Sequence, residues 1–304
     1  MRNAFIKTLI ESARKDDSIC LVVGDLGYGV VEPFKEEFPN RFINAGIAEQ
    51  NMTGMAAGMA LEGKKVVTYS IGNFPTMRCL EQIRNDCAYH NANVKIVCIG
   101  GGFVYGPLGM THHATEDLAI TRALPNVTVF APGDLVEAEE VTKAMLEHEG
   151  TCYLRLGRGG EKRIHEKIEN FEVGKAVRIC DGTDIAIFST GAILDAAQDA
   201  AKLLKDKGLS VAQCSFPTLK PLDKETILEY ANKCKIIATV EEHNIIGGLG
   251  SAVAEVMAEN PSNAKLIRFG LNETYTSIVG KQDYLREQYG ISAEKIAQRI
   301  EEHF

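Results

Sequence analysis

Residues 41–60 read RFINAGIAEQNMTGMAAGMA, and this stretch decides how the rest of the chain is interpreted. Apolar residues between Phe42 and Ile47 predict a short buried strand, and Gly46 predicts a turn into a helix that begins near Glu49. The pattern therefore places an acidic side chain at a strand-to-helix junction. A carboxylate at that place can simply interact with the helix dipole and solvent, or it can face a ligand.

The predicted helix after Glu49 carries few bulky side chains. Gly54 and Gly58 lie four residues apart in it, and a glycine inside a helix costs roughly 1 kcal/mol relative to alanine. The close approach of another group can offset this cost. The small side chains of this helix therefore indicate that a ligand or an interface lies near Glu49, and argue against a Glu49 that only faces solvent.

Length and charge limit the classes of protein to consider. A chain of 304 residues can form two compact domains, and its formal net charge of -8 disfavours nucleic acid as a partner. The first 18 residues predict an amphipathic helix and not a secretory signal. No apolar run approaches the roughly 20 residues that a membrane span needs, so we expect no membrane insertion.

The eight cysteines are scattered, without a Cys-x-x-Cys pair, and most lie in apolar runs. This pattern indicates neither a zinc site nor a disulfide framework. We therefore expect reduced core cysteines, as in a cytoplasmic protein. They are Cys20, Cys79, Cys87, Cys98, Cys152, Cys180, Cys214 and Cys234.

Strands and helices alternate along the whole chain, which predicts an α/β fold with parallel sheets. We expect a first domain over residues 1–160, a polar linker over 161–180 and a smaller α/β domain over 181–304. The first strand ends at Gly24 and Asp25. Such strand ends face ligand crevices in parallel sheets, so Asp25 is a candidate site residue, although a loop or capping position needs no function.

The run GIAEQNMTGMAAGMALEG at residues 46–63 resembles the cofactor-activating segment shared by transketolases and 1-deoxyxylulose-5-phosphate synthases. The resemblance implies a pyrimidine-binding thiamine diphosphate fold with a parallel sheet, followed by a smaller α/β transketolase C-terminal domain. It also implies that Glu49 meets the pyrimidine ring of thiamine diphosphate across a subunit interface. Activation of that cofactor requires a proton to be exchanged at the ring, and a carboxyl group in a dry pocket can share it.

Three further segments are similar to the same family. The pattern Phe74-x-x-x-Arg78-x-x-Glu81-Gln82-Ile83-Arg84-Asn85 resembles a helix of split, two-chain transketolases, which implies that Phe74 stacks on the pyrimidine. Thr111-His112 resembles a Thr/Ser-His-Gln motif, which implies that His112 binds a substrate oxygen and helps to move protons. Arg158 matches an arginine that binds a sugar phosphate. Without the resemblance, these would be a core ring, a loop histidine and a linker arginine.

The C-terminal half carries weaker matches. Residues 220–223 (KPLD), residues 239–243 (TVEEH) and the following GGLGSAVAE resemble the transketolase C-terminal domain. We expect this region to shape the dimer and the rim of the crevice, and we expect His243 to be structural.

One family element is missing. The resemblance implies magnesium-assisted binding of the diphosphate, usually by a Gly-Asp-Gly segment, and no Gly-Asp-Gly occurs in the chain. We therefore expect no metal ligands here. We expect instead a partner, an N-terminal transketolase subunit that holds the Mg²⁺ and the diphosphate, in an α2β2 assembly.

Two departures from the family pattern concern the substrate. Gly100 stands where split transketolases have a histidine, and Leu108 stands where an acidic residue contacts a donor-sugar hydroxyl. Leucine forms no hydrogen bond through its side chain, so we expect a less polar donor pocket and a non-standard ketose donor.

The sequence thus predicts the C-terminal subunit of a transketolase, which transfers a two-carbon ketol unit from a ketose phosphate to an aldose. Two enzyme alternatives share the architecture: a 1-deoxyxylulose-5-phosphate synthase-like chain and a β-type chain of a 2-oxo acid dehydrogenase. A non-catalytic regulatory protein that has kept the fold is an alternative from a different class.

Overall fold

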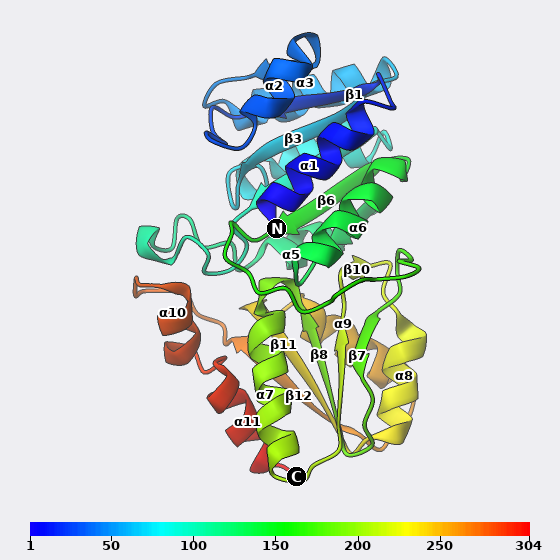
Figure 1. Ribbon diagram of the computed structural model, residues 1–304, viewed down its shortest axis with the longest axis vertical. Helices are drawn as coiled ribbons and strands as arrows, with labels where there is room; N and C mark the ends of the chain where they lie inside the picture. The colour runs from blue at the N-terminus through cyan, green and yellow to red at the C-terminus, as the bar shows by residue number, and fades with distance from the viewer.

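The core strands are mostly apolar and buried throughout, as in β1 (Ile19–Val23), β4 (Val94–Ile99) and β6 (Thr151–Leu156). Strands with both faces covered by helices need this composition. The computed structural model describes all 304 residues and shows two helix-covered sheets, one above the other (Figure 1). The N-terminus lies near their junction and the C-terminus at the far end of the second unit.

The first sheet has seven strands in the order β10-β5-β6-β4-β3-β1-β2. All neighbours pair in parallel except β10, which runs antiparallel to β5. The remaining strands are β2 (Phe42–Asn44), β3 (Lys65–Ile71), β5 (Val127–Phe130) and β10 (Thr218–Lys220). Because β10 comes from the C-terminal half, the sheet of the first unit is completed by a distant segment.

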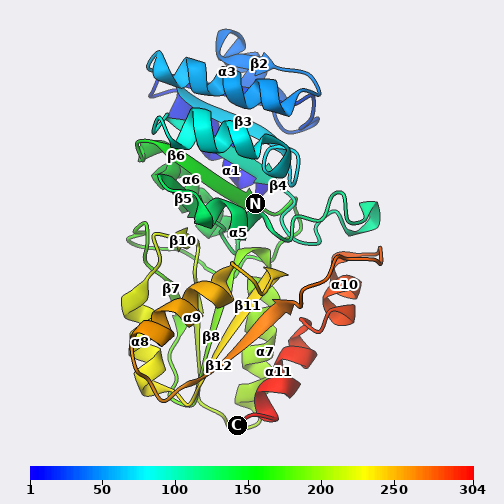
Figure 2. The same cartoon turned by 180° about the vertical axis from the view of Figure 1, so that it is seen from behind.

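Helices cover both faces of this sheet. α1 (Arg2–Ala13) and α6 (Leu135–Glu147) pack together on one face, where Phe5, Leu9 and Met145 share one apolar core. The other face is covered by α3 (Glu49–Leu61), by a helical segment over residues 77–88 and by α5 (Asp117–Ala123) (Figure 2). The segment over 77–88 consists of a 3₁₀ turn Met77–Cys79, α4 (Leu80–Gln82) and a π-helix Ile83–Ala88. A short α2 (Glu32–Glu37) follows β1.

The second sheet has five strands in the order β12-β11-β8-β9-β7, all parallel except β7. α7 and α11 pack on one face, and α8 and α9 on the other, while α10 lies beside the junction (Figures 1 and 2). The strands are β7 (Val177–Cys180), β8 (Ile185–Thr190), β9 (Val211–Ser215), β11 (Ile236–Asn244) and β12 (Lys265–Leu271). The helices are α7 (Leu194–Asp206), α8 (Lys224–Lys233), α9 (Leu249–Glu259), α10 (Gln282–Gln288) and α11 (Ala293–Glu301).

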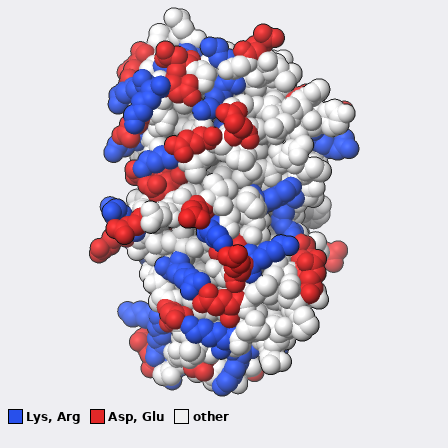
Figure 3. All heavy atoms as spheres, turned by 90° about the vertical axis from the view of Figure 1, so that its right-hand side faces the viewer, with Lys and Arg blue, Asp and Glu red and all other residues white.

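The predicted parallel α/β architecture is confirmed, with two additions. The short strands β7 and β10 were not predicted, and β7 lies inside the stretch 161–180 that we expected to be a linker. No helix combines the length and apolar character needed to cross a bilayer. Basic and acidic side chains are interspersed on the face shown in Figure 3. All eight cysteines are free, and only Cys180 is not buried.

Candidate active site

Glu49 is the first residue of α3, and its side chain is only 2% exposed. The turn before it is held by Asn44, whose side-chain oxygen accepts hydrogen bonds from the backbone N–H groups of Asp25 and Gly46. Gly24, at the end of β1, lies so close that a Cβ atom there would be 3.4 Å from Glu49 Cγ. The carboxylate is therefore held in a dry position near the carboxyl ends of the parallel strands, where α/β sheets bind ligands.

Arg78 joins Glu49 to Phe74. Its Nη1 donates a hydrogen bond of 2.8 Å to Glu49 Oε2, and its guanidinium carbon lies 4.6 Å from the centroid of the Phe74 ring. Arg78 belongs to the 3₁₀ turn after β3, and Phe74 lies four residues before it. The structure thus brings together two predicted cofactor-binding residues from separate segments through a third residue that sequence reasoning did not assign to the site.

His112 lies beside Phe74. Its ring centroid is 5.2 Å from that of Phe74 in an edge-on geometry and 6.4 Å from that of Tyr105. The guanidinium of Arg158 in turn lies 5.4 Å from the Tyr105 ring. Glu49, Phe74, His112 and Arg158, four of the five predicted site residues, are therefore connected by side-chain contacts through Arg78 and Tyr105.

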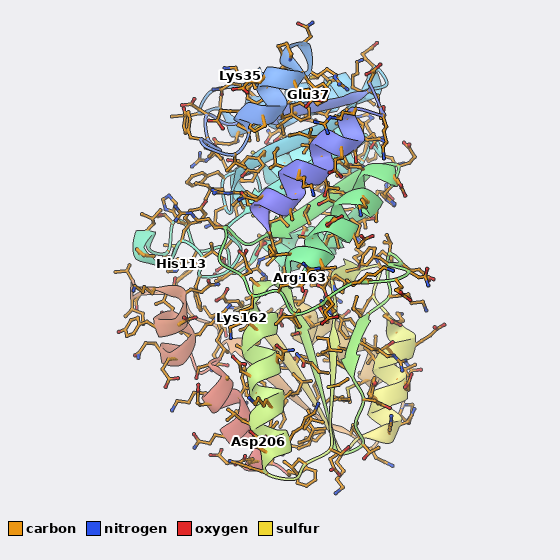
Figure 4. The ribbon with its side chains drawn as sticks, in the orientation of Figure 1. Lys35, Glu37, His113, Lys162, Arg163 and Asp206 are labelled. Atoms are coloured by element: carbon orange, nitrogen blue, oxygen red, sulfur yellow. The ribbon has the colours of Figure 1, made fainter.

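The neighbouring His113 has a structural position. Its buried imidazole bonds to Thr276 Oγ1 (2.6 Å, Nδ1) and to the carbonyl of Gly106 (3.1 Å, Nε2). Burial lowers the pKa of His113, in keeping with a neutral ring that donates through Nε2 and accepts through Nδ1. His113 therefore ties its loop to a segment of the second unit (Figure 4), and it is His112 that lies beside Phe74.

Asp25 forms hydrogen bonds with residues close to it at the end of β1 and β2. Its carboxylate accepts hydrogen bonds from Tyr28 (3.0 Å) and from the Asn44 amide (2.9 Å), and these bonds lower the pKa of Asp25. Its φ of 54° is a left-handed conformation that aspartate tolerates better than most residues. No hydrogen bond joins its carboxylate to Glu49, so its link to the site is the shared Asn44 turn.

The three consecutive glycines 100–102 lie where the backbone is crowded by neighbouring side chains. A Cβ atom on Gly101 would lie 1.9 Å from Arg155 Nε, and one on Gly102 would lie 2.5 Å from a carboxylate oxygen of Glu242. Arg155 is buried and donates hydrogen bonds to the carbonyls of Ala114 and Glu242. This buried arginine fixes the end of the His112 loop against the second unit.

Tyr105 fills the space that a side chain at Gly100 would take. A Cβ atom on Gly100, whose φ is +88°, would lie 2.1 Å from Tyr105 Cε2. Burial raises the pKa of the Tyr105 hydroxyl, so the ring is a neutral group in the pocket. Leu108 is exposed on the 3₁₀ turn Gly106–Leu108. The space beside Gly100 is thus filled by a phenol ring from the following loop, a contact that the sequence pattern did not reveal.

An open groove of about 460 Å³ runs along the exposed side of Phe74 and Arg78. Its remaining walls include the apolar side chains of Met77, Met110 and Tyr275, all of them exposed. The site is therefore open on one side and bordered by apolar surface.

The residues present fit the pyrimidine end of thiamine diphosphate. They supply a dry carboxylate, an aromatic face and the buried Ser70 hydroxyl, which has no hydrogen-bond partner. Ser70 Oγ and Glu49 Oε1 lie 3.6 and 3.7 Å from the same point, the position of a Cβ atom on Gly24. No group of three or more His, Cys, Asp or Glu side chains has the geometry to hold a metal ion.

Comparison with known families identifies both units of the chain. The profile described as Transketolase, pyrimidine binding domain matches residues 1–160, and that described as Transketolase, C-terminal domain matches residues 174–296. The fold and these matches define a chain with a pyrimidine-binding unit followed by a transketolase C-terminal unit. The chain belongs to the transketolase family.

Similar proteins include separate chains of comparable length. A "Putative transketolase C-terminal section" from Methanocaldococcus jannaschii is 42% identical over 99% of this chain and 95% of its own length. One of the subunits of an apulose-4-phosphate transketolase from Actinobacillus succinogenes is 34% identical over 97% of this chain and 96% of its own. A solved structure titled "Split gene transketolase, inactive beta4 tetramer" is 35% identical, with a TM-score of 0.88 over 99% of this chain and 96% of that one.

Proposed function

We propose that the chain is the C-terminal subunit of a thiamine diphosphate-dependent transketolase. Its reaction is the transfer of a two-carbon ketol unit from a ketose phosphate to an aldose. The observation that carries this proposal is the buried Glu49 carboxylate, joined through Arg78 to the Phe74 ring and bordered by His112. A regulatory chain that had only kept the fold would have no need for this arrangement.

Each site residue has a role that its position supports. When bound, thiamine diphosphate supplies the nucleophilic carbon that accepts the ketol unit. Glu49 holds and exchanges a proton at the far nitrogen of the pyrimidine ring, and Phe74 orients the ring by stacking. His112 donates a hydrogen bond to the substrate oxygen that gains charge and helps to move its proton.

Two further roles lie at the edges of the site. Arg158 is exposed and lies beside Tyr105, where its guanidinium can bind a distal phosphate of the substrate. Asp25 supports the cofactor side through the Asn44 turn that it shares with Gly46. Glu49 and His112 thus act on the reacting groups, and Arg158 acts on the substrate's far end.

The partner is an N-terminal subunit that holds the diphosphate and Mg²⁺, in an α2β2 assembly. Three observations support this part of the proposal. The chain lacks a Gly-Asp-Gly segment, its site is open, and exposed apolar side chains such as Ile47, Met77 and Met110 lie near that site. The similar structure titled as an inactive β4 tetramer supports the expectation that this chain alone is inactive.

The donor is a ketose outside the common pentose and hexose phosphates. Gly100 has no side chain to contact a substrate, and the exposed Leu108 offers no side-chain hydrogen bond, so this part of the site has fewer polar contacts for the donor. The relative named for apulose-4-phosphate supports the idea that separate chains of this type serve unusual ketoses. The free, mostly buried cysteines fit a reducing cytoplasm as the location.

Reconstitution with the cognate N-terminal subunit tests the proposal. Glu49→Gln is expected to lower kcat by about 10²–10⁴-fold and to leave assembly unchanged, because glutamine keeps the shape but cannot exchange the proton. Glu62→Gln, at the exposed end of the same helix, is the matched control and should keep full activity. Full activity of Glu49→Gln, or of the purified chain alone, would refute the proposal.

Product analysis separates the enzyme alternatives. A 1-deoxyxylulose-5-phosphate synthase or a 2-oxo acid dehydrogenase releases carbon dioxide from its donor, whereas ketol transfer from a ketose releases none. Carbon dioxide release with pyruvate, and no reaction with any ketose, would favour those alternatives.

A further inference from the structure

We propose that Arg78 is a placeholder for the cofactor ring. In the chain alone its guanidinium occupies the contacts of Glu49 and Phe74, and it must leave them when the pyrimidine ring binds. This inference rests on the proposed function, and it concerns how the same site is regulated. It assigns a role to a residue that the transfer chemistry itself does not use.

The contacts of Arg78 match those expected of the ring. A guanidinium is planar, carries N–H donors and stacks on aromatic faces. Arg78 donates to Glu49 Oε2 at 2.8 Å and lies over the Phe74 ring at 4.6 Å. An aminopyrimidine ring is also planar and stacks, and its far nitrogen shares a proton with Glu49, so the two groups compete for one carboxylate and one aromatic face.

The difference in burial between the two partners favours displacement. Glu49 is 2% exposed, whereas the Arg78 side chain is 47% exposed and borders the open groove. A buried carboxylate without a partner is strongly unfavourable, so the guanidinium stabilises Glu49 while no ring is bound. Arg78 can then turn into the groove, where its charge is hydrated.

This arrangement makes cofactor binding an exchange of partners. The ring gains the contacts of Glu49 and Phe74, and the chain gives up an ion pair and a cation–π contact of modest strength. Removing the guanidinium should therefore tighten cofactor binding, because the free state loses contacts that the bound state lacks. A residue that held the ring directly would have the opposite effect.

Titration calorimetry of the reconstituted complex with thiamine diphosphate and Mg²⁺ tests the idea. Arg78→Met should bind the cofactor about tenfold more tightly than the wild type, and Arg78→Lys, which keeps the charge but cannot stack as a planar group, about threefold more tightly. Arg84→Met is the matched control, since Arg84 is exposed on the same helical segment and its Nη1 donates only to Asn85. Its affinity should stay at the wild-type value.

A second measurement needs no cofactor. In the isolated chain, Arg78→Met should lower the thermal midpoint by a few degrees, whereas Arg84→Met should not. Unchanged or weaker cofactor binding by both Arg78 variants would overturn the inference. Failure of the wild-type complex to bind thiamine diphosphate at all would instead refute the proposed function on which the inference rests.

Discussion

Replacing Glu137 with glutamine should make the chain more stable at pH 8 and have a much smaller effect at pH 5. Glu137 lies in the first turn of α6 with its carboxyl group completely buried. Its Oε2 accepts a hydrogen bond of 2.6 Å from the backbone N–H of Gly133, and its Oε1 lies 3.8 Å from His165 Nε2. Burial raises the pKa of Glu137 from 4.5 to about 7, against the opposing effects of His165 and the Gly133 N–H.

The direction of the pH effect follows from this pKa. A carboxyl group that binds its proton more tightly in the folded chain stabilises that chain fully below pH 4.5. The stabilisation is lost progressively as the pH rises from 4.5 through about 7, so that only a minor part of it is lost at pH 5. Since each factor of ten in proton affinity is about 1.4 kcal/mol, the ionised group costs about 3 kcal/mol at pH 8. Burial lowers the pKa of His165, but its bond to Asp134 outweighs this effect and raises the pKa. The contribution of His165 to the stability of the fold is therefore also lost as the pH rises.

Glutamine keeps the carbonyl that accepts from Gly133 and removes the charge. We expect Glu137→Gln to raise the free energy of unfolding by about 2 kcal/mol at pH 8, less than the full cost because glutamine does not attract His165. Urea unfolding at pH 5 and pH 8 measures both values. Glu139→Gln, on the exposed face of the same helix, is the control and should change stability by less than about 0.5 kcal/mol. Equal destabilisation by Glu137→Gln at both pH values would refute the reasoning, because it would mean that an ionised Glu137 stabilises the fold through His165.

Three other variants test the site and its support. Phe74→Ala should weaken binding of thiamine diphosphate to the reconstituted complex by about tenfold in calorimetry, because the stacking face is lost; unchanged affinity would contradict the role of Phe74. Arg158→Ala should raise KM for phosphorylated substrates by about 10–100-fold and leave KM for unphosphorylated ones unchanged, and an equal effect on both would argue against a phosphate contact. Gly101→Ala should lower the free energy of unfolding by about 2 kcal/mol in urea, because its Cβ atom would lie 1.9 Å from Arg155 Nε; wild-type stability would show that Arg155 moves freely.

Much of the fold could be predicted from the sequence, because parallel strands buried on both faces leave apolar runs such as those of β1 and the first four residues of β8. β7 and β10 escaped this reasoning for a physical reason. Both are short, include polar residues and pair antiparallel at sheet edges, so their strand conformation depends on contacts far away in sequence.

The candidate site was also predictable only in part. Glu49, Phe74 and His112 stand in recognisable local motifs, so their proximity could be expected before the structure was known. Arg78 stands in the same motif as Phe74, but the motif does not reveal its contact with Glu49, which depends on the distance between the start of α3 and the turn after β3. Tyr105 was missed because it fills the space at Gly100 from five residues further along the chain.

The antiparallel pairing of β10 with β5 limits how this protein can be divided. A fragment that ended at residue 160 would lack residues 218–220 and would leave β5 with unpaired N–H and C=O groups, an edge that invites aggregation. During synthesis, the same edge stays open until residue 220 has left the ribosome. Attempts to express the pyrimidine-binding half by itself, or to exchange it between relatives, should therefore carry this downstream strand along with it.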